Sequence, residues 1–161
     1  MRFEDVYREH VTPVWRYVRL RVPSDRDAED VVSMVFEKAL RSWDAYDADR
    51  GSVGGWVTGI ARHTVVDWWR KQGRELPTDV VPDGAALDDP EGDALRSVGG
   101  DEVRRRLGML SAREREVVAL RFGSELTSEQ IGAVLGISSG AARMLLHRAV
   151  GRLREVMADE R

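Results

Sequence analysis

Apolar residues recur at helical spacing in three stretches of the first half of the chain. The first stretch predicts an amphipathic helix over about Arg2–Arg21, and Pro13 is expected to kink or divide it because proline lacks a backbone donor. The second predicts a helix over Asp27–Trp43, and the third predicts a helix over residues 53–72. The polar segment Asp44–Ser52 separates these two helices and is predicted to be a loop. The N-terminal part of the chain is therefore expected to be helical.

The same periodicity is clearest in the C-terminal stretch between Leu126 and Glu155. Thr127 and Gln130 have the spacing of a capping box, so a helix should begin at about Thr127. Gly136 can end that helix in the left-handed conformation, which leaves room only for a turn. The helix after the turn has apolar residues at steps of four, three and four, namely Ala142, Leu146, Ala149 and Leu153. This spacing places them on one buried stripe.

Basic residues follow the polar side of this last helix, and no acid interrupts them between Ala141 and Arg154. They are Arg143, His147, Arg148, Arg152 and Arg154. Two helices joined by a tight turn, the second of them basic, have the layout of a helix-turn-helix whose second helix enters the DNA major groove. The alternative is a solvated basic face on an ordinary helical hairpin.

Another capping box, Ser111 with Glu114, precedes the apolar residues Val117, Val118, Leu120 and Phe122 and predicts a further helix. Residues 101–161 thus form a unit of about four helices. Residues 73–100 differ in kind, because they hold three of the five prolines and no sustained apolar period. The expected fold is all-α, with two small helical domains, residues 1–72 and 101–161, joined by a flexible linker over residues 73–100.

The charge distribution agrees with this division. Residues 1–71 carry 12 basic and 12 acidic side chains, residues 72–100 carry 2 and 7, and residues 101–161 carry 11 and 9. The overall net charge of -3 therefore comes from an acidic linker rather than from the C-terminal domain.

Two features of residues 53–72 leave alternatives open. Gly54, Gly55 and Gly59 weaken a helix, so we expect either close helix packing or a late helix start near Trp56. Trp68 and Trp69 are adjacent and cannot both face one core. One of them is expected to pack against a neighbouring helix or to be exposed for stacking on an unpaired base.

Several classes of protein are disfavoured. The chain has no cysteine, which excludes disulfides and thiolate chemistry. No apolar run reaches the ~20 residues that span a bilayer, and the N-terminus is too polar for a signal peptide. We therefore expect a cytoplasmic protein without membrane insertion. His10, His63 and His147 are scattered, and no metal-ligand cluster, phosphate-binding loop or nucleophile constellation is present, so neither an enzyme nor a cofactor or metal site is expected.

The motifs resemble an extracytoplasmic-function (ECF, Group IV) sigma factor of bacterial RNA polymerase, in the sigma-70 family, over nearly the whole chain. DAEDVVSMVFEKALRSW resembles region 2.2, and DAYDADRGSVGGWVTGIARHTVVDWWRK resembles regions 2.3 and 2.4. LSAREREVVALRF and LTSEQIGAVLGISSGAARMLLHRA resemble region 4. Response-regulator output domains carry a similar LS-x-RE-x-EV stretch. The DAED motif, the IAR motif and the tryptophans upstream therefore discriminate between the two.

The resemblance implies roles for three sets of residues. Those expected to dock on the beta-prime clamp helices of core RNA polymerase are Asp27, Glu29, Asp30, Ser33, Met34 and Glu37. Those expected to contact the minus-10 element, where a base is flipped into the loop, are Tyr46, Arg50, Ser52, Arg62, His63, Asp67, Trp69, Arg70 and Lys71. Those expected to contact the minus-35 element are Ser138, Ser139, Gly140, Arg143, Met144, His147 and Arg148. The acids Asp27, Glu29 and Asp30 lie in the first turn of the helix predicted over Asp27–Trp43. Their alternative role is to cap that helix.

The chain departs from the usual family pattern at five informative positions. Met144 and Leu145 replace a serine and an arginine of the recognition helix, which would exchange polar base contacts for apolar contact with a thymine methyl if both face the groove. Ser33 and Met34 replace the glutamine and glutamate that commonly follow the DAED motif. His63, where asparagine is common, is also a departure.

The resemblance also implies partners and a geometry. Core polymerase, through its clamp helices and its beta flap, promoter DNA and an anti-sigma protein acting in trans are the expected partners. The promoter elements lie two DNA turns apart, about 70 Å, whereas a free chain of the linker's length averages about 30 Å. We therefore expect the polymerase to hold the domains apart, and the isolated chain to bind promoter duplex poorly. A stand-alone helix-turn-helix regulator and a sigma-like protein that does not initiate are the alternatives.

Overall fold

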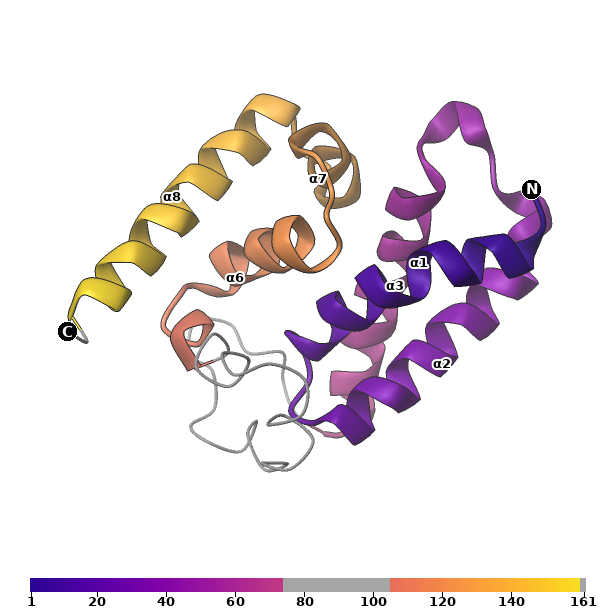
Figure 1. The fold of residues 1–161 in the computed structure, drawn as a ribbon, viewed down its shortest axis with the longest axis horizontal. Helices are drawn as coiled ribbons and strands as arrows, with labels where there is room; N and C mark the ends of the chain where they lie inside the picture. Colours follow the sequence, from indigo (N-terminus) through magenta and orange to yellow (C-terminus); the bar gives the residue numbers. More distant parts are fainter. Residues whose placement is uncertain (74–104, 160–161) are drawn as a thin grey trace.

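The computed structural model describes residues 1–73 and 105–159 (Figure 1). Within those ranges the chain forms helices and turns and contains no strand, as the predicted all-α fold requires. Apart from Gly73, the predicted linker over residues 73–100 lies outside the described residues. So do residues 101–104, the beginning of the predicted C-terminal domain.

Three helices form the N-terminal domain: α1 (Phe3–Arg19), α2 (Asp25–Arg41) and α3 (Val53–Lys71). Valine and alanine side chains from all three helices meet in the core, with Val6, Val18, Ala28, Val35, Val57 and Ala61 fully buried. Two short 3-10 turns, η1 (Trp43–Ala45) and η2 (Ala48–Arg50), lie in the predicted loop between α2 and α3.

Pro13 does not divide α1, which runs unbroken from Phe3 to Arg19. The missing proline N–H deprives only the carbonyl of Glu9 of its helical partner. Glu9 is exposed, so water can hydrogen-bond to that carbonyl. Of the two predicted effects of Pro13, a kink or a division, the division is wrong, and the defect lies on the solvent side of α1.

The glycines of α3 do not delay its start. Ser52 is the N-cap residue, and its hydroxyl accepts a hydrogen bond from Gly55 N at 3.1 Å, so the helix begins at Val53 rather than near Trp56. A Cβ on Gly54 would lie 3.4 Å from His10 Cε1, whereas one on Gly59 would meet nothing within 4 Å. The Gly54 distance is an ordinary van der Waals contact with a side chain, so close helix packing requires a glycine at neither Gly54 nor Gly59.

The C-terminal domain consists of α6 (Ala112–Val118), the π-helical turn η3 (Ala119–Gly123), α7 (Ser128–Leu135) and α8 (Ser139–Asp159). The capping box predicted at the start of α6 is present: Ser111 N donates to Glu114 Oε1 at 2.9 Å, and Glu114 N donates to Ser111 Oγ at 3.2 Å. The buried apolar side chains of this domain include Leu107, Leu110, Val117, Leu120, Ile131, Ala142 and Ala149.

The π-helical turn η3 changes the direction in which the last apolar residues of the predicted helix point. A π turn holds more residues than an α turn, so side chains within it depart from the spacing of an α-helix. Ala119 and Leu120 are fully buried, but Phe122 is 59% exposed. Phe122 therefore does not join the other apolar residues of this segment in the core.

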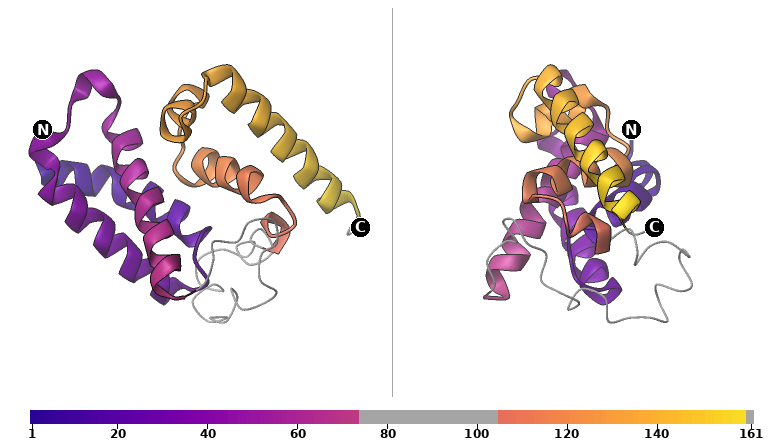
Figure 2. Two further views of the ribbon diagram at one scale, coloured as in Figure 1. Left: turned by 180° about the vertical axis from the view of Figure 1, so that it is seen from behind. Right: turned by 90° about the vertical axis from the view of Figure 1, so that its left-hand side faces the viewer.

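The two domains lie against each other, with α1 packed on η3 and α3 on α7. Figures 1 and 2 show α1, α2 and α3 together on one side of the molecule and α8 on the far side of the C-terminal domain. The contact brings Gly123 close to the backbone of α1. A Cβ on Gly123 would lie 3.0 Å from both the N and the Cα of Tyr17.

Candidate nucleic-acid and polymerase interface

An acidic row occupies the solvent side of α2. Glu29, Asp30, Ser33 and Glu37 are exposed, at positions that share one side of the helix. Glu37 also forms an i,i+4 ion pair with Arg41 at 2.6 Å. The row therefore presents carboxylates to solvent, where a basic partner can reach them. Met34, by contrast, is half-buried and packs against the core.

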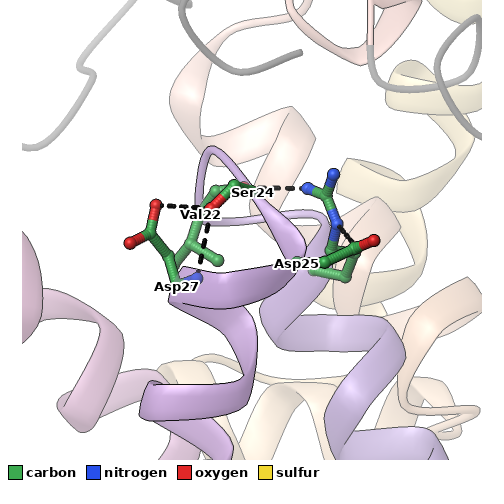
Figure 3. Close-up of polar contacts among 5 residues, drawn as sticks. Val22, Ser24, Asp25 and Asp27 are labelled. Atoms are coloured by element: carbon green, nitrogen blue, oxygen red, sulfur yellow. Dashed lines mark hydrogen bonds and ion pairs between the residues drawn. The ribbon is translucent and has the colours of Figure 1, made fainter. Parts of the chain in front are cut away.

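Asp27 has a structural role at the start of α2. Ser24 is the N-cap residue, accepting a hydrogen bond from Asp27 N at 3.1 Å and donating its hydroxyl to Asp27 Oδ2 at 2.9 Å (Figure 3). The helix accordingly begins at Asp25, two residues earlier than predicted. The capping alternative is the one that the structure shows for Asp27.

A buried ion pair joins α1 to the start of α2. The Arg19 guanidinium donates to Asp25 Oδ1 and to the carbonyl of Val22, the latter at 3.2 Å (Figure 3). Both charged side chains are at least nine-tenths buried. The sequence pattern did not reveal this pair, because an arginine at the end of one amphipathic helix and an aspartate before the next look like ordinary surface charges.

Aromatic rings line the loop between α2 and α3. Trp43 and Tyr46 stack with their centroids 5.4 Å apart and their planes at 4°, and Trp56 lies 5.2 Å from Tyr46. The Tyr46 hydroxyl donates to the carbonyl of Gly51 at 2.7 Å, which closes the loop on itself. The predicted flipped-base loop is thus organised around a set of half-buried rings.

The other two residues predicted for the flipped-base pocket differ in environment. Arg50 is exposed, with Asp47 3.8 Å from its Nε. Ser52 caps α3 and also accepts a hydrogen bond from the side-chain nitrogen of Gln130, in the C-terminal domain, at 2.9 Å. In this conformation the Ser52 hydroxyl is therefore already engaged by two donors.

On α3, the predicted strand-binding residues divide between two surroundings. Four of them, His63, Asp67, Arg70 and Lys71, are exposed. The side chain of Arg62 is about one-third exposed and contacts the C-terminal domain, its Nε lying 3.0 Å from Glu116 Oε1. Asp67 has Lys38 at 3.8 Å and Arg70 at 4.0 Å. Arg62 thus lies at the contact between the domains, whereas the other four residues face solvent.

Trp69 is not available for base stacking in this structure. Trp68 and Trp69 are 8% and 4% exposed, and their rings meet edge to face with centroids 5.1 Å apart. Trp69 Nε1 donates to the carbonyl of Arg21 at 2.9 Å. The predicted contact of Trp69 with the minus-10 element conflicts with this burial. The expectation that Trp68 and Trp69 cannot both face one core is therefore wrong: the two rings pack against each other, and Trp69 is hydrogen-bonded to the backbone just after α1.

The helix-turn-helix agrees closely with its predicted bounds. Thr127 N donates to Gln130 Oε1 at 2.8 Å and Gln130 N donates to Thr127 Oγ1 at 3.2 Å, which confirms the capping box. Gly136 ends α7 in the left-handed conformation, with φ 72° and ψ 32°. Ser138 Oγ then accepts a hydrogen bond from Ala141 N at 3.0 Å at the start of α8. The turn is therefore fixed at one end by Gly136, as predicted, and at the other end by Ser138.

The solvent side of α8 carries the residues predicted for minus-35 contact. Arg143, His147 and Arg148 are exposed, and the Met144 side chain beside them is 58% exposed. Ser138 and Gly140, at the start of the helix, are also exposed, and Ser139 is half-buried. This surface combines cations with one apolar side chain at its centre.

Leu145 does not share this exposed surface. It is half-buried and packs against the apolar core of the domain. The condition that both Met144 and Leu145 face the groove is therefore not met by Leu145 in this structure. A helix turns about 100° per residue, and the step from Met144 to Leu145 leads from the exposed side of α8 to the side that packs against the core.

Sequence reasoning gave no special role to Glu116, which the structure buries between the domains with a side chain 8% exposed. The Tyr17 hydroxyl donates to Glu116 Oε1 at 2.8 Å, and Arg21 Nε lies 3.0 Å from Glu116 Oε2. Burial, reinforced by this carboxylate, raises the pKa of Tyr17 well above its ordinary value. Tyr17 and Glu116 are 99 positions apart, so no local spacing could have paired them.

None of the helices in the described part of the chain combines the length and the apolar content needed to cross a bilayer. Within the same residues, no group of three or more histidine and acidic side chains is placed to hold a metal ion.

Comparison with known proteins assigns both domains. The family profile "Sigma-70 region 2" matches residues 6–75, and "Sigma-70, region 4" matches residues 106–155. An RNA polymerase sigma-E factor of Streptomyces avermitilis is 31% identical over 156 residues, which cover 96% of this chain and 84% of the relative. The ECF RNA polymerase sigma factor SigD of Mycobacterium bovis is 33% identical over 150 residues, which cover 88% of this chain and 70% of the relative.

Two solved structures share the fold. The structure of CnrH in complex with the cytosolic domain of CnrY matches with a TM-score of 0.76 at 23% identity, covering 99% of this chain and 89% of that one. The sigma factor RpoE of Bartonella quintana, in complex with the anti-sigma factor NepR, matches with a TM-score of 0.73 at 21% identity, covering 99% and 98%. The chain belongs to the extracytoplasmic-function sigma factors of the sigma-70 family, with a region 2 domain followed by a region 4 domain.

Proposed function

We propose that this chain binds core RNA polymerase and directs promoter-specific initiation by recognising minus-10 and minus-35 elements and helping to open the DNA. The observation that carries the proposal is the presence of two sigma domains in one chain, each with an exposed charged surface of the sign that its partner requires. The acidic row of α2 suits a basic protein surface, and the basic side of α8 suits DNA.

For polymerase docking, the proposal assigns the exposed row of α2 to the beta-prime clamp helices. Glu29, Asp30, Ser33 and Glu37 are accessible in the free chain, which supports this assignment. Asp27 acts by shaping the start of the helix, and Met34 by packing beneath the row. The region 4 domain is assigned to the beta flap.

For the minus-10 element, Tyr46, Arg50 and Ser52 are proposed to receive a flipped base, and His63, Asp67, Arg70 and Lys71 to lie along the strand together with Arg62. Extruding a base costs a few kcal/mol, which stacking and edge hydrogen bonds must return. The aromatic set of Trp43, Tyr46 and Trp56 beside the loop supports this role, because stacking requires ring faces. Trp69 is left out of this proposed surface.

For the minus-35 element, Ser138, Ser139, Gly140, Arg143, Met144, His147 and Arg148 are proposed to face the major groove. The cations would hold phosphates or guanine edges, and Met144 would contact a thymine methyl. Leu145 contributes through the core and not through the bases.

The remaining parts of the proposal follow from family membership. The related proteins are sigma factors, which are not enzymes, and we propose that this chain likewise performs no covalent chemistry and acts in the cytoplasm. Residues 73–100 join the domains 1–72 and 101–161, and an anti-sigma protein controls the chain in trans. The core enzyme holds the two domains apart on the promoter.

Run-off transcription with core polymerase on genomic fragments tests the proposal. Discrete transcripts that require the chain are expected, and their start sites report the promoter. Stable association with core polymerase without any transcript would indicate a sigma-like protein that does not initiate. DNA binding without polymerase association would indicate a stand-alone regulator.

A charge reversal tests the docking surface. The variant Glu29→Lys with Asp30→Lys should weaken binding to core polymerase by at least about tenfold, because a charged contact at an interface is worth more than about 1.4 kcal/mol. Glu4→Lys, which reverses an exposed acid on α1, is the matched control and should bind normally. Equal affinity of all three proteins would overturn the assignment of the α2 row.

A further inference from the structure

The surface between the two domains is organised around one carboxylate. Glu116 of α6 meets three side chains of the region 2 domain: the Tyr17 hydroxyl at 2.8 Å, Arg21 Nε at 3.0 Å and Arg62 Nε at 3.0 Å. They come from α1, from the turn after α1 and from α3, respectively. These three segments of the region 2 domain therefore all contact the same residue of the region 4 domain, Glu116.

The burial of this cluster makes it depend on the contact between domains. The side chains of Glu116 and Arg21 are 8% and 9% exposed, and Tyr17 is fully buried. Taking an isolated charge out of water is costly, and it persists only where opposite charges and hydrogen-bond donors surround it. If the domains separated, Glu116 and both arginines would regain water. The cluster therefore forms only while the two domains are in contact, and it can break when they separate.

A steric fit accompanies the charges. Gly123 approaches the backbone of α1 so closely that a Cβ would lie 3.0 Å from the N and Cα of Tyr17 and 3.3 Å from the carbonyl carbon of Arg16. These are backbone atoms, which cannot move aside as a side chain can. At the rim, the Arg16 guanidinium donates to Glu125 Oε1 at 3.0 Å.

The contact occupies two side chains that the proposed function assigns to the minus-10 element. The Arg62 guanidinium is paired with Glu116, and the Ser52 hydroxyl accepts from Gln130 of α7. The helix-turn-helix thus touches the minus-10 loop directly, whereas the promoter elements are about 70 Å apart, two turns of duplex. One molecule cannot hold this contact and occupy both elements at the same time.

We propose that Glu116 and Gly123 form an intramolecular lock that keeps the free chain closed, with the region 4 domain covering part of the minus-10 surface. The partner of this surface is the chain's own second domain. The consequence for promoter binding rests on the proposed function, whereas the lock itself does not. Opening requires a competitor that binds the two domains separately and more tightly than they bind each other.

A charge swap in the full-length chain tests the lock. The chain has no cysteine, so the substitutions Arg8→Cys and Arg154→Cys, at exposed positions on α1 and α8, accept a pair of spin labels. The chain that carries only these two labelled cysteines should give one narrow distribution of label distances. Glu116→Arg should give a broad distribution with a longer mean, because it places three cations together. Adding Arg21→Glu to that variant should restore the short distance, since the swap recreates a pair across the interface.

Two controls make the result decisive. Glu129→Arg, a reversal at an exposed position on α7, should leave the narrow distribution unchanged. Circular dichroism should show the same helix content in every variant. Position 116 would face solvent in an open chain, where an arginine is tolerated as well as a glutamate. A short distance in the Glu116→Arg chain would overturn the lock, and so would a broad distribution in the unmodified chain.

Gly123→Ala opens the interface without changing charge. Its matched control is Gly151→Ala in α8, where an added Cβ meets nothing within 4 Å. In the Gly123→Ala chain the labels should separate, and a randomised pool of single-stranded DNA should bind several-fold more tightly, because apparent affinity scales with the competent fraction. Labels that stay close in the Gly123→Ala chain would contradict the steric part of the lock.

The experiment distinguishes failure of the lock from failure of the proposed function. Core polymerase added to the labelled wild-type chain should separate the labels as the substitutions do. A chain that binds no polymerase, yet opens in the Glu116→Arg variant, would overturn the proposed function and leave the lock standing. A chain that drives transcription but shows no change in label distance on substitution would overturn the lock alone.

Discussion

The substitution Gly132→Ala tests the geometry of the helix-turn-helix most directly. Gly132 lies in α7 under the turn, and its carbonyl accepts a hydrogen bond from Ile137 N at 2.9 Å. A Cβ at Gly132 would lie 2.7 Å from Ile137 O and 3.2 Å from the carbonyl carbon and oxygen of Ser138. These are backbone atoms of the turn, so the turn itself must shift to admit one methyl group.

Two opposing effects set the magnitude. Alanine is favoured over glycine in a helix interior by up to about 1 kcal/mol. Forcing an extra carbon into a packed site costs about 1–3 kcal/mol, and the upper part of that range applies where backbone must move. We therefore expect Gly132→Ala to lower the free energy of unfolding of the region 4 domain by about 1–2 kcal/mol.

Urea unfolding followed by circular dichroism measures this loss, and amide hydrogen exchange at Ile137 reports on the turn hydrogen bond. Gly151→Ala is the control, because it gains the same helix propensity with open space around the added Cβ. The two variants should differ by about 2–3 kcal/mol, with opposite signs relative to the wild type. Equal stabilisation by both substitutions would refute the close approach of Gly132 to the turn.

Three further predictions concern other parts of the chain. Because burial keeps Tyr17 protonated when folded, the unfolded tyrosine ionises first, and stability should fall as pH rises above about 10; Tyr17→Phe should flatten that fall in thermal unfolding, and an unchanged slope would argue against the buried hydroxyl. Asp25→Asn removes the buried carboxylate that accepts from the Arg19 guanidinium and should lower the free energy of unfolding in urea by about 1.5–3 kcal/mol; a loss within error of zero would contradict the burial of the pair. Met144→Ser should alter base preference at one or two minus-35 positions by about 1–3 kcal/mol in a selection from randomised promoters, whereas an unaltered preference would remove Met144 from the interface.

Local spacing was sufficient for much of the helix-turn-helix. Thr127, Gln130 and Gly136 act within a few residues of one another, so their capping bonds and the left-handed turn follow from the sequence in any fold that contains them. The alternation of Ala142 and Ala149 with arginines similarly separated the buried and exposed sides of α8. The directions in which Leu145 and Phe122 point did not follow from local spacing, because packing around α8 and the π-helical turn decided them.

The candidate site was less accessible to sequence reasoning. The acidic row of α2 could be named in advance because charged residues on one side of an amphipathic helix remain exposed. The burial of Trp69 could not be predicted from the sequence. It depends on the tertiary packing that brings the carbonyl of Arg21 within reach of the ring N–H. Asp25 likewise looked like a surface acid until Arg19 was found beside it.

The sequence alone determined the helices of the two domains and the family, because periodicity, caps and motif order are properties of neighbouring residues. The tertiary structure alone decided how the domains meet. Glu116 contacts Tyr17 across 99 positions and Arg62 across 54, and Gly123 is fitted to a backbone more than a hundred residues away. Contacts of this range depend on the packing of several elements at once. They decide whether an exposed-looking charge is free to bind DNA or is held within the protein.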